Sequence, residues 1–292
     1  RRERNKKIAA EDSEEEDEFI TELNKKEEDS LHTAISEVLG ALFKTHKVHS
    51  LTIIDFFYNN ILSRFLAPEA SNEDHKFAIF VIDDVIEFVG QDLAQDKWNA
   101  LAEALVKYAA DTDDTVRQAA VYGIGILAAH SKNETFGPWV SQIIQVLESA
   151  ISIPVTKSKK SHGHARDNAI AALGRIIKFQ YPNINPATVV PAWVNLLPLR
   201  FDKVEARTMH DILLDLALSN LQLVIGDNQE RLGHLMKMFA EILETKMLDS
   251  GSVPKVKSLF ETVQAAGYPG LQEIWATFTD IQKEKVSKVL GQ

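Results

Sequence analysis

The chain repeats one apolar pattern at intervals of about forty residues, and this restricts its possible folds more than any other feature. In Val116–Leu127, small and branched apolar residues recur at helical spacing, with Gly125 among them. Gly174 stands at the equivalent place of a later segment. The pattern occurs in four further segments: Leu31–Leu42, Ala78–Ile86, Ala165–Ile176 and Val204–Leu214. One helix pair cannot bury such a face alone, so the pattern predicts stacked helix pairs.

The first of these segments predicts its own buried stripe. At the spacing of Val116–Leu127, Gly40 is equivalent to Gly125. The residues then expected to face the core are Leu31, Ala34, Ile35, Val38, Leu39 and Leu42.

Strand signals are nearly missing, because alternation of apolar and polar residues is rare along the chain. The 292 residues are 45% hydrophobic and 25% charged, which is enough to bury a large core. We therefore predict an all-α chain, a right-handed α-solenoid of about six antiparallel helix pairs.

The first 28 residues differ from the rest in composition. They are dense in charge, and Glu11–Glu18 is almost entirely acidic. Such a block repels itself, so residues 1–28 are predicted to be a mobile or marginally helical lead-in. The solenoid is predicted over residues 29–292, with its first helix running from Asp29 to about Thr45. Since the chain starts without Met, inside a charged stretch, we expect it to be part of a longer protein.

Charge and residue usage narrow the function classes. The formal net charge is −10, which favours basic partners and disfavours direct nucleic-acid or anionic-membrane binding; acidity that serves only solubility is the alternative. Without any cysteine, disulfides, thiolate metal sites and a cysteine nucleophile are excluded. No further ligand accompanies His162 and His164 at suitable spacing, so no metal is expected. Motifs of hydrolases and nucleotide-binding enzymes are missing, and we expect neither enzyme activity nor a cofactor.

The segment that opens at Asp114 resembles the second helix of a HEAT repeat, with Val-Arg and then small residues. Four blocks in this order are similar to the C-terminal region of the karyopherin-β nuclear import receptors, importin-five branch: FVIDDVIE (Phe80–Glu87), VRQAAVYGIGILA (Val116–Ala128), DNAIAALGRIIKF (Asp167–Phe179) and WVNLLPLRFDKVEA (Trp193–Ala206). The similarity runs from about Ser30 to the end. The last block departs from the pattern, because Lys203-Val204 stands where Val-Arg is expected.

The resemblance implies a fragment of a transport receptor that shuttles between cytoplasm and nucleus. Its implied partners are protein cargo with basic localisation signals and Phe-Gly nucleoporins. The Ran GTPase is expected to bind mainly the N-terminal part of such receptors, which is mostly missing here. A static HEAT-repeat scaffold, for example of the phosphatase regulatory type, is the alternative function.

Carboxylates are the candidate cargo-binding groups. In a HEAT stack the second helices line the concave side, and helical geometry places several acidic residues opposite the core stripe. A shielded row of carboxylates suits a Lys- or Arg-rich segment. At Gly125 and Gly174 we expect a bound backbone to approach closely. Alternatively, Asp83 and Asp84 pair with arginines or lysines of neighbouring repeats and only fix the stacking. The candidates are Asp83, Asp84, Glu87, Asp211 and Asp215.

Tryptophans are the candidate nucleoporin-binding groups. Trp98, Trp139 and Trp193 fall on predicted first helices, which face the convex side, and so does the fourth, Trp275. Grooves beside them would suit Phe-Gly segments; ordinary core packing is the alternative. Lysines of the long connector Pro154–His164 are candidates to contact an acidic patch or Ran, or form a solvated loop: Lys157, Lys159 and Lys160.

Overall fold

The computed structural model describes residues 26–156 and 160–291, and the predicted lead-in up to residue 25 lies outside them. The described residues contain helices and turns and no strand, which confirms the all-α fold class. None of these helices is long and apolar enough to cross a membrane. The chain divides into two compact units, Arg1–Leu101 and Ala102–Gln292, and we describe each by itself.

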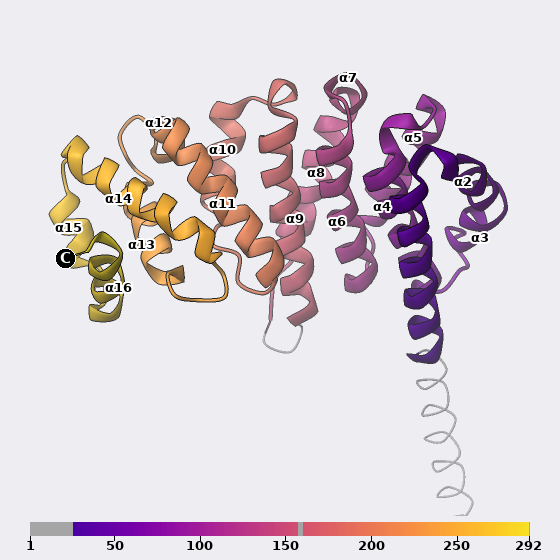
Figure 1. Ribbon diagram of the computed structural model, residues 1–292, viewed down its shortest axis with the longest axis horizontal. Helices are drawn as coiled ribbons and strands as arrows, with labels where there is room; N and C mark the ends of the chain where they lie inside the picture. The colour runs from indigo at the N-terminus through magenta and orange to yellow at the C-terminus, as the bar shows by residue number, and fades with distance from the viewer. Residues whose placement is uncertain (1–25, 157–159, 292) are drawn as a thin grey trace, which may run out of the picture. The chain divides into compact units, whose positions relative to one another are not determined.

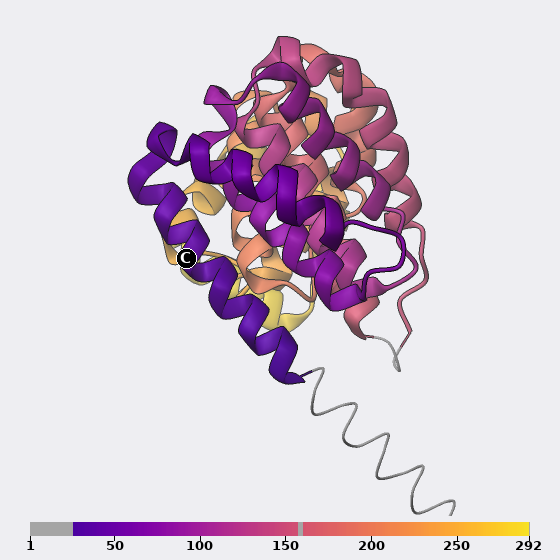
Figure 2. The same cartoon turned by 90° about the vertical axis from the view of Figure 1, so that its right-hand side faces the viewer.

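The first unit contains two long helices, formed by residues 26–46 and by α4 (Asn72–Val89), which run beside each other (Figure 2). Ser71 and Asp74 form a capping box that fixes the start of α4. Shorter helices connect and follow them: η1 (Lys47–Ser50), α2 (Leu51–Phe57), η2 (Tyr58–Leu62), α3 (Ser63–Phe65), η3 (Gly90–Asp92) and the start of α5 (Gln95–Tyr108).

The predicted buried stripe of the first helix is wrong. Leu31 and Val38 are 60% and 62% exposed, and Ile35 and Leu42 are also exposed. Of the predicted stripe, Leu39 alone is buried, and the helix otherwise buries residues one position along: Ser36, Gly40 and Phe43. The periodicity was right, but two apolar stripes lie side by side on this helix, and only one of them faces α4.

In the second unit, four second helices lie side by side in one layer (Figure 1). These are α6 (Asp114–His130), α9 (Lys160–Phe179), α11 (Lys203–Ser219) and α14 (Val253–Ala266). The partner helices are α8 (Val140–Ile151), α10 (Pro186–Val194) and α13 (Leu232–Ile242). Short helices complete the unit: α7 (Asn133–Phe136), η4 (Gly137–Trp139), η5 (Tyr181–Asn183), α12 (Leu221–Ile225), η6 (Ser250–Ser252), α15 (Leu271–Ala276) and α16 (Asp280–Leu290).

Local signals fix where these helices begin. The side chain of Asp113 accepts hydrogen bonds from the backbone N–H groups of Thr115 and Val116, and Asp202 caps α11 in the same way. The connector after Pro154 is shorter than predicted, because α9 already begins at Lys160. Lys157 and Lys159 lie outside the described residues.

The repeated glycines hold neighbouring helices close together. A Cβ atom at Gly125 would lie 3.2 Å from Arg175 Cδ and 3.4 Å from the Cα atom of Ala172, both on α9. At Gly174 it would meet Met209 of α11 and, at 2.8 Å, the Trp193 ring. The prediction that a bound backbone approaches these glycines is therefore wrong, because adjacent helices already fill the space.

Candidate functional site

The two predicted acidic residues of the second unit, Asp211 and Asp215, are paired with a lysine of the next second helix. Lys255 of α14 donates to Asp211 of α11, with Nζ 2.9 Å from both carboxylate oxygens, and it lies 2.6 Å from Asp215 Oδ1. The Ser252 hydroxyl also donates to Asp211, over 2.7 Å. Partial burial raises the pKa of Asp211, but the hydrogen bonds from Lys255 and Ser252 outweigh it and leave the pKa lowered. The pairing alternative, weighed for other acids, thus applies here.

A second ion pair, which is buried, joins α9 to α11. The Arg175 guanidinium donates two hydrogen bonds to Glu205, with Nη1–Oε2 and Nη2–Oε1 distances of 2.7 and 2.9 Å. The exposed fractions of the two side chains are only 13% and 5%. The guanidinium also lies over the ring of Tyr122 of α6. One arginine therefore bridges three consecutive second helices.

The predicted acidic residues of the first unit lack such partners among the described lysines and arginines. Asp83, Asp84 and Glu87 occupy two consecutive turns of α4, and neither aspartate forms an ion pair with a lysine or arginine of the described residues. Asp83 is 5% exposed, and both its carboxylate oxygens are buried without a hydrogen-bond partner. Asp84 is half-buried against Gly40, and Glu87 is exposed.

This environment raises the pKa of both aspartates. For Asp83, burial is the main cause and the neighbouring charges of Asp84 and Glu87 add to it. For Asp84, burial and then Glu87 raise the pKa to about 6. The α4 cluster, Asp83, Asp84 and Glu87, is therefore a group of closely spaced carboxyls whose ionised forms a nearby cation would stabilise.

The structure brings the predicted carboxylates together in two sets. The first is the α4 cluster, and the second is Asp211 with Asp215 on α11. Sequence reasoning missed Lys255, which neutralises the second set from 44 residues beyond Asp211. A lysine one repeat later was the available signal, but the stacking register needed to use it was unknown.

Two of the predicted tryptophans do not offer a binding surface. Trp193 is completely buried and donates its indole N–H to the carbonyl of Ile170, over 3.0 Å. Trp98 is 3% exposed. For these two the packing alternative holds, because a ring closed off from solvent cannot contact a passing peptide. Trp139 is half-buried at the start of α8.

The fourth tryptophan lines an apolar groove. Trp275 is half-buried and lies 5.3 Å from Phe278 between ring centroids. With Met236 of α13 and Phe260 of α14, these rings border a groove of about 360 Å³. Among the tryptophans, Trp275 is thus the one placed to accept an aromatic side chain beside it.

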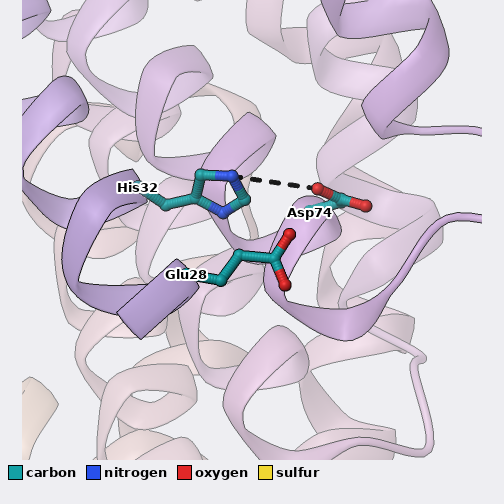
Figure 3. Close-up of side chains that lie close together, drawn as sticks. All are labelled: Glu28, His32 and Asp74. Atoms are coloured by element: carbon teal, nitrogen blue, oxygen red, sulfur yellow. Dashed lines mark ion pairs between the residues drawn. The ribbon is translucent and has the colours of Figure 1, made fainter. Parts of the chain in front are cut away.

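A histidine and two carboxylates meet at the start of α4. In Figure 3, Glu28 and His32 of the first helix point toward Asp74, and the ligand atoms of the three residues lie within 4.8 Å of one another. His32 Nε2 lies 3.9 Å from Asp74 Oδ1, and its ring stacks on Phe77. Asp74 also accepts from the Ser71 backbone in the capping box. We assign this cluster to the fixing of the first helix on α4.

No model of a known protein family matches the chain. A probable importin-5 homolog of Dictyostelium discoideum is 30% identical over 129 residues, which cover 42% of this chain and 12% of that protein. Crystal structures of the karyopherin Kap121p match 89% to 90% of this chain at 22% identity: bound to Pho4p with a TM-score of 0.63, to RanGTP with 0.62, and to Nup53p with 0.59.

These matches confirm the fold of a karyopherin α-solenoid and the predicted resemblance to the C-terminal HEAT-repeat region of the importin-five branch. The chain spans about 22% of the length of Kap121p and 12% of the importin-5 homolog.

Proposed function

We propose that the chain is part of a nuclear transport receptor, in which residues 29–292 form a repeat region that binds basic cargo and nucleoporins. The observation that carries the cargo site is the α4 cluster, whose aspartates form no ion pair with the described lysines and arginines. The fold match to Kap121p, solved with Pho4p, RanGTP and Nup53p, supports the class of function. A receptor of this kind moves between cytoplasm and nucleus. The fold match to Kap121p does not favour the alternative function, a static HEAT-repeat scaffold.

Within the cluster, Asp84 and Glu87 are the proposed contacts for cargo. Both side chains reach solvent. Asp83 is buried and is therefore not proposed to contact cargo. A lysine or arginine placed between Asp84 and Glu87 would relieve the repulsion that raises the pKa of Asp84. Asp211 and Asp215 are weaker candidates, because an incoming cation must displace Lys255.

The test is fluorescence anisotropy with a lysine-rich localisation peptide. The double variant Asp84→Asn, Glu87→Gln is expected to weaken binding about ten-fold, because two charge-assisted contacts are lost. The matched control, Asp211→Asn with Asp215→Asn, also removes two charges, and we expect a loss of less than about two-fold. Equal losses in the two double variants would contradict the proposal.

For nucleoporins, we propose the groove beside Trp275. Its lining is mostly apolar, and an inserted phenylalanine would bury its ring against Trp275, Phe278 and Met236. Trp275→Ala should weaken binding of a Phe-Gly peptide about ten-fold. Trp139→Ala serves as the control, and a larger effect there would move the proposed contact to the start of α8.

A further inference from the structure

A second cavity of the Ala102–Gln292 unit has a lining of the opposite character. It lies between α9, the segment of residues 196–201 and α13, and its volume is about 290 Å³. Arg166, Arg200 and Lys237 line it, in a chain whose formal net charge is −10. Three cations around one small cavity are therefore a local exception to the acidic character of the chain.

Two of these cations have no partner among the described residues. No hydrogen bond or ion pair engages the side chain of Arg166 or Lys237, whereas Arg200 donates to Glu241 over 2.7 Å. The Arg200–Glu241 pair is open to solvent, with side chains 59% and 43% exposed. Such a pair is weak, so an incoming anion can compete with Glu241 for Arg200.

The other acidic group of the lining, Asp167, is already occupied. Its Oδ2 atom accepts hydrogen bonds from the backbone N–H groups of Arg200, Phe201 and Asp202, over 2.9, 2.6 and 3.0 Å. Asp167 therefore holds the 196–201 segment in place. Asp167 and Glu241 offset part of the positive charge of the lining, which keeps a formal excess of one, and neither carboxylate forms an ion pair with Arg166 or Lys237.

Apolar side chains also line the cavity. Ile170, Leu197 and Met238 are almost fully buried, whereas Leu196, Pro198 and Phe201 are half-buried and can contact a ligand. The volume is at the lower end of the range for ligand sites, with room for a side chain or two but not for a large cofactor. The apolar and cationic side chains of the lining together select a ligand that has both characters.

We propose that this cavity binds a peptide segment in which an anionic side chain, a carboxylate or a phosphate, stands beside an apolar side chain. The apolar group lies on Leu196 and Phe201, and the anion is held by Arg166 and Lys237. Arg200 joins them when it releases Glu241. This site is independent of the α4 cluster, which has the opposite charge.

The test is fluorescence anisotropy with labelled octapeptides that differ at one position, where phosphoserine, glutamate or glutamine precedes a leucine. We expect the phosphoserine or the glutamate peptide to bind at least about five-fold more tightly than the glutamine peptide. Whichever of the two binds more tightly identifies the source of the anion. Replacing the leucine by serine should weaken binding about five-fold.

Three variants locate the binding. Lys237→Gln and Arg166→Gln should each weaken binding of the anionic peptide about five-fold, and Glu241→Gln should strengthen it about two-fold by freeing Arg200. Lys283→Gln, which removes a charge outside the lining, is the matched control, and melting temperatures report whether each variant folds. The proposal is overturned if the glutamine peptide binds as tightly as the anionic ones, if none binds, or if Lys237→Gln and Glu241→Gln change nothing.

Discussion

The two units differ in whether acidic residues on their second helices form ion pairs. In Ala102–Gln292, Glu205 and Asp211 each pair with a basic residue of an adjacent second helix. In Arg1–Leu101, Asp83 and Asp84 form no ion pair with the described lysines and arginines, and burial raises both pKa values. Paired acids stabilise the stacking of repeats, whereas unpaired acids cost stability and remain available to a partner.

The largest expected effect is on the buried ion pair. Arg175→Met leaves the Glu205 carboxylate buried without its partner and should lower the free energy of unfolding by about 3 kcal/mol. Urea denaturation measures this change. In the double variant with Glu205→Met, most of the loss should be recovered. A single variant as stable as the wild type would show that the pair does not hold α9 on α11.

Next in size is the contrast between two equivalent glycines. Gly174→Ala forces a methyl group against Met209 and the buried Trp193 ring, and should cost about 2 kcal/mol. The methyl group of Gly40→Ala meets only the carboxylate end of Asp84, which can rotate away, so a cost below about 1 kcal/mol is expected. Thermal unfolding compares the two. Similar losses would mean that the units are packed alike.

Replacing Asp83 should raise the free energy of unfolding, in contrast to the two changes above. Its pKa is raised on folding, so the folded state binds more protons, and stability falls as pH rises above the ordinary value of 3.8. Asp83→Asn removes this cost and should raise the free energy of unfolding by about 1 to 2 kcal/mol at neutral pH. The difference should shrink toward pH 4. Hydrogen exchange of α4 amides measures it, with exposed Asp96→Asn as the control. Destabilisation at neutral pH would indicate a partner for Asp83.

The smallest effect is expected at the solvent-exposed pair of the second unit. Since the pKa of Asp211 is lowered on folding, its contribution is present at neutral pH and is lost as pH falls below its ordinary value of 3.8. Asp211→Asn should therefore cost less than about 1 kcal/mol at pH 7 and nothing in strong acid. Urea denaturation at both pH values checks this. A cost that persists in acid would point to packing instead of charge.

The sequence predicted the helices well, because periodicity, capping residues and glycines are local signals. Ser71 and Asp113 are two such capping residues, at the starts of α4 and α6. Contacts between repeats were less predictable. Gly125 was expected to face a ligand, but Arg175, fifty residues further on, covers it. Which residue of one repeat meets which of the next depends on stacking register, and periodicity within a helix does not determine it.

The candidate site was predicted only in part, and the reason is again that the stacking register was unknown. The acids of α4 and α11 occupy equivalent positions by sequence, yet Lys255 pairs with Asp211 while Asp84 lacks such a lysine among the described residues. For the tryptophans, the helix was predictable but the depth of burial was not, since a ring on a first helix can point inward, as Trp193 does, or border a groove, as Trp275 does.

The central claim is that the α4 carboxylates receive a cation from a partner, and the pH dependence of binding tests it most directly. A lysine or arginine favours ionised Asp84, whose pKa is about 6, so binding must release protons near that pH. Isothermal titration of a lysine-rich peptide from pH 5 to 7.5 should show affinity rising about five-fold with pH in the wild type and unchanged in Asp84→Asn. The same affinity at every pH in the wild type, or the same rise in Asp84→Asn, would contradict the account.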